Sequence, residues 1–79
     1  MSITAILVTR RIDKRVGFLK EACKKGSSVE AQKLVTKTVM KYLTYWTPKL
    51  NDKERCEVKD YIKKEYAVVV NQGGNNESD

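Results

Sequence analysis

The chain has 79 residues and a formal net charge of +6, with sixteen Lys and Arg, ten acidic residues, two Cys and no His. This length allows one domain, and the lack of histidine argues against structural zinc, which needs about four nitrogen or sulfur ligands. No apolar run approaches the roughly 20 residues of a membrane span. The sequence therefore predicts a soluble intracellular protein, cytoplasmic or nuclear, with two free thiols and no cofactor.

The first predicted element is the apolar run 3–8, with the sequence ITAILV. If one straight helix joined this run to the next segment, Ile3, Ile6 and Leu7 would point away from the apolar face that follows. The run is therefore predicted to be a separate element, and its β-branched residues favour a strand. A short helix with a bend near 9–11 is the alternative.

A helix is predicted over 12–25, because apolar residues recur there every three or four positions. Its expected buried stripe consists of Ile12, Val16, Leu19 and Cys23. Asp13 is placed to be an N-cap or a first-turn acid. Gly26 is placed to end the helix in the left-handed conformation.

The central helix is predicted over 29–46, and the other elements are expected to cover its apolar face. Ser27 and Glu30 fit a capping box at its start, and Thr47 ends it because a proline follows. Its apolar stripe consists of Ala31, Val35, Val39, Tyr42 and Trp46.

A third helix is predicted over 52–66, because Asn51 and Glu54 form a second capping pattern. Its stripe consists of Val58, Tyr61, Ile62 and Tyr66. The valines of 67–70 either extend this helix or form a strand, which they favour. The polar tail 71–79 is expected to be disordered. Residues 1–70 are thus predicted to form one mainly α domain of three helices with a short apolar N-terminal element. Because so short a chain has a small core, the protein is also predicted to form a homodimer.

Part of this pattern resembles the ribbon-helix-helix family of dimeric DNA-binding proteins. The resemblance covers residues 3–43, with an apolar N-terminal run, a Gly-Ser turn between two helices and the segment LVTKTVMKYL. It implies that N-terminal strands pair across a dimer and place alternating side chains in the major groove. Thr4, Ile6 and Val8 hold those positions and are mostly apolar here, so this fold with an added C-terminal helix is the alternative architecture.

Two basic groups indicate where a polyanion would bind. One group lies at the junction where the 12–25 helix begins and comprises Arg10, Arg11, Lys14 and Arg15. The other is a row of residues four apart on the central helix, Lys33, Lys37 and Lys41. Such cations contact phosphate backbones, although a solvated helix face has the same pattern.

Aromatic residues gather near the end of the central helix, at Tyr42, Tyr45 and Trp46. Aromatic rings among cations stack on single-stranded bases, serve as hot spots of protein interfaces or belong to an ordinary core whose polar edges stay wet. These three residues are the predicted interface.

Catalytic chemistry is not expected, because the commonest general base is absent and Cys23 falls among apolar residues. The predicted function is that of a small basic nucleic-acid-binding protein, a regulator that contacts phosphates and prefers DNA to RNA. The alternative is an adaptor or inhibitor that docks on an acidic surface of a larger protein.

Overall fold

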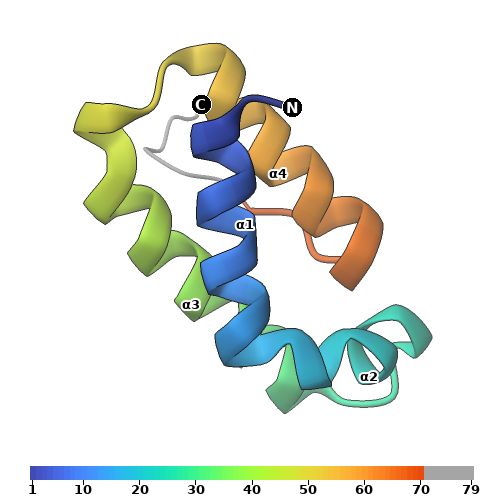
Figure 1. Cartoon of the computed structure of the whole chain (residues 1–79). Coiled ribbons are helices and arrows are strands. Elements are labelled where there is room, and N and C mark those ends of the chain that lie inside the picture. Colours follow the sequence, from blue (N-terminus) through green and yellow to red (C-terminus); the bar gives the residue numbers. More distant parts are fainter. Residues whose placement is uncertain (71–79) are drawn as a thin grey trace, which may run out of the picture.

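The computed structural model describes residues 1–70 as a mainly α fold, and the tail prediction for 71–79 lies outside this range. The elements are α1 (Ile3–Val16), the 3-10 turn η1 (Gly17–Leu19), α2 (Lys20–Lys25), α3 (Val29–Trp46), η2 (Thr47–Lys49) and α4 (Asp52–Tyr66). Helix α1 packs against both α3 and α4, whereas α3 and α4 touch each other much less (Figure 1). The predicted helical class is confirmed.

The predicted N-terminal strand is wrong, because 3–8 form the first turns of α1. The hydroxyl of Ser2 caps the helix by accepting a hydrogen bond from the Ala5 N–H at 3.1 Å. The buried face of α1 has regular helical spacing and consists of Ala5, Val8, Thr9, Ile12 and Val16. The large residues Ile3, Ile6 and Leu7, expected to form the apolar face of a helix here, are all exposed.

Two further expectations fail with that strand. No strand occurs within 1–70, so the ribbon-helix-helix alternative lacks its defining element. Asp13 lies inside α1 and is no N-cap. A bend does separate two helical segments, but it falls at η1 instead of 9–11, and it divides the predicted 12–25 helix.

Helix ends explain most of the connections. Gly26 adopts the predicted left-handed conformation, with φ 65°. The Gly26 N–H bonds to the Cys23 carbonyl and the Ser27 N–H to the Ala22 carbonyl, both at 3.1 Å. This pair is a Schellman motif, which closes α2 and turns the chain toward α3.

The bounds predicted for α3 and α4 are confirmed, but one of the two caps differs. Ser28, not Ser27, caps α3, accepting from the Ala31 N–H at 3.1 Å. At α4 the predicted capping box is present, since Asn51 and Glu54 each accept from the other's backbone N–H. The hydrogen bond from the Asn51 backbone N–H lowers the pKa of Glu54, and a bond from the Ser2 hydroxyl adds a smaller effect in the same direction.

The segment after α4 is neither helix nor strand. Ala67 ends the helix with φ 53°, and the chain then runs without regular structure to Val70. Val68 and Val70 are buried and Val69 is exposed, so alternate side chains cover the core. Both expectations for 67–70, a longer helix or a strand, are therefore wrong.

The two cysteines are free, as predicted, with Cys23 buried and Cys56 exposed. Within 1–70, no helix combines the length and the apolar character required to cross a lipid bilayer.

Candidate functional site

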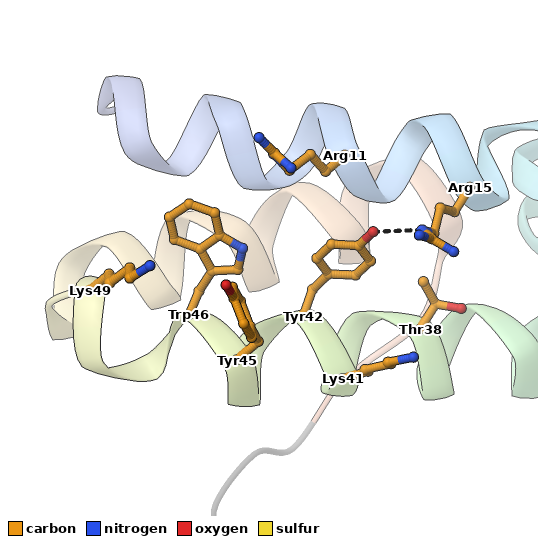
Figure 2. A pocket seen from close by; sticks show the side chains of 8 residues that line it. All are labelled: Arg11, Arg15, Thr38, Lys41, Tyr42, Tyr45, Trp46 and Lys49. Atoms are coloured by element: carbon orange, nitrogen blue, oxygen red, sulfur yellow. Dashed lines mark hydrogen bonds between the residues drawn. The ribbon is translucent and has the colours of Figure 1, made fainter.

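An open pocket of about 550 Å³ lies between the C-terminal halves of α1 and α3, and we call it the α1–α3 pocket (Figure 2). It is lined by Arg11, Arg15, Thr38, Lys41, Tyr42, Tyr45, Trp46 and Lys49. Helix α1 contributes the two arginines, while α3 and η2 contribute the rest. The pocket thus combines four cations with three aromatic rings.

Helical spacing places these side chains together. Arg11 and Arg15 are one turn apart on α1, beside the buried Ile12 that packs this helix into the core. On α3 the lining residues also recur every three or four positions, so they share the edge that faces α1. Figure 2 shows Tyr42 and Trp46 rising from α3 toward α1. The turn η2 then brings Lys49 beside Trp46.

Arg15 and Tyr42 join the two walls of the pocket. The Arg15 Nε donates a hydrogen bond to the Tyr42 hydroxyl at 2.6 Å, and the guanidinium carbon lies 5.9 Å from the Tyr42 ring centroid. This contact uses one donor of the guanidinium, whose planar fork has five. The other donors remain to bind an anion.

The end of the pocket next to η2 is lined by aromatic and basic side chains. The rings of Tyr45 and Trp46 meet edge to face, with centroids 6.0 Å apart and an interplanar angle of 74°. The Lys49 ammonium lies 5.4 Å from the Tyr45 centroid and 5.2 Å from the Trp46 centroid. Tyr45 nevertheless remains 67% exposed, so a ligand can reach its ring.

Within residues 1–70, no carboxylate lines the α1–α3 pocket. The ion pairs found within 1–70 involve other cations, namely Lys20, Lys24, Lys25, Arg55 and the N-terminal amine. The four cations of the pocket are therefore not neutralised by the described part of the chain. A recess lined by one sign of charge concentrates counter-ions, and a bound polyanion would relieve the repulsion among these cations.

Six of the ten predicted site residues meet in this pocket: Arg11, Arg15, Lys41, Tyr42, Tyr45 and Trp46. Arg10 and Lys14 are exposed elsewhere on α1. Lys33 and Lys37 line a second, more open groove of about 480 Å³ on α3, together with residues such as Val29 and Met40. The structure therefore divides the predicted lysine row between two surfaces.

The sequence reasoning missed Thr38 and Lys49 as members of the site. Lys49 stands four positions after Tyr45 and three after Trp46, which is the spacing of one helical face. Pro48 predicts the end of the helix and of that face, whereas the 3-10 turn η2 continues the chain closely enough to keep Lys49 beside both rings.

A second polar cluster surrounds Asp13 at the junction of α1, α2 and α4. Its carboxylate accepts hydrogen bonds from the Tyr61 hydroxyl at 2.5 Å and the Tyr66 hydroxyl at 2.6 Å. The Lys20 ammonium lies 3.5 Å from the same carboxylate. Burial, and then the bond to Asp13, raise the pKa of both phenols. The hydrogen bonds from both phenols tie α4 to α1, and Lys20 adds α2 to the cluster.

No protein-family model matches this chain, and neither the curated proteins nor the solved structures include a significantly similar one.

Proposed function

We propose that this chain is a small, non-catalytic nucleic-acid-binding protein, a regulator that prefers DNA to RNA and contacts phosphates through the α1–α3 pocket. The observation that carries the proposal is a set of four cations that have no carboxylate partner in the described part of the chain, Arg11, Arg15, Lys41 and Lys49. The phosphate backbone supplies most of the affinity of such proteins, because each contact releases condensed counter-ions.

The chemistry of the pocket suits phosphate. Arginine binds phosphate oxygens with two parallel N–H donors, which a lysine cannot do. Tyr42 holds Arg15 at the mouth of the pocket, so less side-chain entropy is lost on binding. Residues 1–70 contain all sixteen basic residues against eight of the ten acidic ones, so the field of the whole domain attracts a polyanion.

Binding titrations followed by fluorescence anisotropy test the proposal. Labelled single-stranded DNA, duplex DNA and RNA of the same sequence are each titrated at salt concentrations from low to physiological. Four phosphate contacts predict a plot of log K against log salt with a slope of about −3 to −4. Arg11→Glu should weaken binding to every sequence and make the slope shallower by about 1. Lys64→Glu makes the same charge change on the exposed face of α4 and serves as the control. No binding at low salt, or equal losses in both variants, would refute the proposal.

A second candidate function rests on the exposure of Tyr45 beside the half-buried Trp46. Exposed aromatic anchors with neighbouring cations also form hot spots of protein interfaces. In this case the partner is an acidic surface of a larger protein. Tyr45→Ala would then abolish binding to that protein, while moderate salt would only weaken it.

The homodimer expected from the short chain is part of the proposal, since a second copy would double the number of phosphate contacts. Sedimentation equilibrium tests it, with a mass twice that of the monomer expected at micromolar concentration. A monomeric mass would contradict the homodimer, and each protein molecule would then bind through a single α1–α3 pocket.

A further inference from the structure

We infer that the α1–α3 pocket takes single-stranded nucleic acid, with one unstacked base against Tyr45 and Trp46 and the adjoining phosphates on Arg11, Arg15 and Lys41. This inference rests on the proposed function and names the class of nucleic acid that the same site binds. It follows from the shape of the site, the exposure of the rings and the order of the side chains.

The cations line a recess instead of a ridge. Its volume, about 550 Å³, falls within the roughly 300–1,000 Å³ of pockets that enclose a small ligand. Sequence-specific readers of duplex DNA insert a protruding helix or ribbon into the major groove. A recess between two helices cannot enter a groove, but it can receive one nucleotide that projects from a flexible strand.

The exposed ring of Tyr45 offers a surface on which a base can stack. Tyr45 is 67% exposed, and the 74° angle between the rings lets a base lie on one face while its edge meets the other ring. In a duplex both faces of each base are covered by its neighbours, so only a single strand offers a face to these rings.

Cationic and aromatic residues alternate along α3 and η2, as phosphates and bases alternate along a nucleic-acid strand. Lys41, Tyr45 and Lys49 follow one another at intervals of four residues, and all three line the pocket. A base on Tyr45 therefore has a cation on either side for the phosphates that precede and follow it. The Lys49 ammonium lies over both rings, so the incoming base displaces it toward the backbone of the strand.

Trp46 makes the inference directly measurable, because it is the only tryptophan of the chain. Its fluorescence is followed while a single-stranded oligonucleotide, the matching duplex and a free mononucleotide are added separately. We expect the single strand to quench the emission and to bind at least about tenfold more tightly than either the duplex or the mononucleotide. Quenching by the mononucleotide at the same concentration as the strand would assign the pocket to free nucleotides and overturn the inference.

Two variants at Tyr45 separate stacking from charge. Tyr45→Ala should weaken single-strand binding by about 5- to 150-fold, the range found for the loss of one base–aromatic stack. Tyr45→Phe keeps the ring and should bind as the wild type does. Circular dichroism checks that both variants stay folded, which the exposure of Tyr45 favours.

The outcomes distinguish this inference from the proposed function. If no nucleic acid binds, both fail. If the duplex binds as tightly as the single strand, or if Tyr45→Ala has no effect on single-strand binding, the single-strand inference fails and phosphate binding stands.

Discussion

Asp13 shows how one side chain can hold several elements together. From the third turn of α1 its carboxylate accepts from Tyr61 and Tyr66 of α4 and faces Lys20 of α2. Tyr66 is fully buried, and a buried hydroxyl must have a partner. Sequence spacing could not reveal this contact, because 48 and 53 positions separate the residues that meet. The helical phase did place Tyr61 and Tyr66 on the inward stripe of α4.

Removing the Tyr66 hydroxyl should destabilise the protein. Tyr66→Phe keeps the ring in the core but deletes a hydrogen bond to a charged acceptor, which contributes about 1.5–3 kcal/mol. Urea denaturation at pH 7 should show a free energy of unfolding lower by this amount. Tyr45→Phe, which loses an exposed hydroxyl, should stay within about 0.5 kcal/mol of the wild type. Equal effects in the two variants would contradict the role assigned to the cluster.

The raised pKa of Tyr66 predicts that stability falls at alkaline pH. Above the ordinary tyrosine pKa of about 10, the unfolded chain loses this proton while the folded protein keeps it. The unfolded state then binds fewer protons, so the free energy of unfolding decreases as the pH rises, whereas below about pH 10 this contribution is fully present. Tyr61 and Cys23, whose pKa values are also raised by burial, act in the same direction.

The Tyr66→Phe variant isolates this contribution. Urea midpoints measured from pH 8 to 11 should fall less steeply in the variant, so that the stability difference from the wild type narrows above about pH 10. Parallel curves across the whole range would contradict the pKa shift.

At the scale of elements, helix ends were easier to predict from sequence than the phase of α1. The Asn51–Glu54 box and Gly26 act as their residue types predict. The N-terminal run was misassigned because hydrophobic size was equated with burial. Ala5 and Thr9 face the core, where α1 packs between α3 and α4, while Ile3 is 86% exposed. Small residues suit such a crowded position, and a pattern that counts only large apolar residues misses them.

The two left-handed helix ends predict opposite effects of exchanging Gly and Ala. Ala67 has φ 53° and Gly26 has φ 65°, a conformation that costs a residue with a Cβ about 1–2 kcal/mol. Ala67→Gly should stabilise the protein by about 0.5–1 kcal/mol after the greater flexibility of unfolded glycine is counted. Gly26→Ala should destabilise it by about 1 kcal/mol.

Thermal unfolding checks both exchanges. For a domain of this size each kcal/mol shifts Tm by about 4–8 °C, so the two variants should move apart on either side of the wild type. A lower Tm for Ala67→Gly would contradict the strain assigned to that residue.

At the scale of the whole molecule, the candidate site was predictable in composition and not in arrangement. The sequence identified Arg11, Arg15 and the aromatic residues of α3 as separate groups. A helical 3–16 segment packed along α3 brings them to one pocket, whereas the expected strand over 3–8 would have placed Arg11 in a connector. The same packing separates Lys41 from Lys37, which is one turn away and lines the other groove.

This separation gives a matched pair of variants. Lys41→Glu and Lys37→Glu make the same charge change at two exposed positions of α3. Because only Lys41 lines the α1–α3 pocket, its reversal should weaken nucleic-acid binding at least about tenfold more in anisotropy titrations at moderate salt. Equal losses would mean that the lysine row acts as one surface and would contradict the site described above.

Amide NMR spectra recorded during titration with a single-stranded oligonucleotide would locate bound nucleic acid on the protein residue by residue. Binding in the α1–α3 pocket should produce saturable shifts of the Trp46 indole N–H and of the Thr38, Lys41 and Tyr45 amides, with little change at Lys63 and Lys64 on α4. Shifts confined to Val29, Lys33 and Lys37 of the second groove, or no shifts at all, would contradict it.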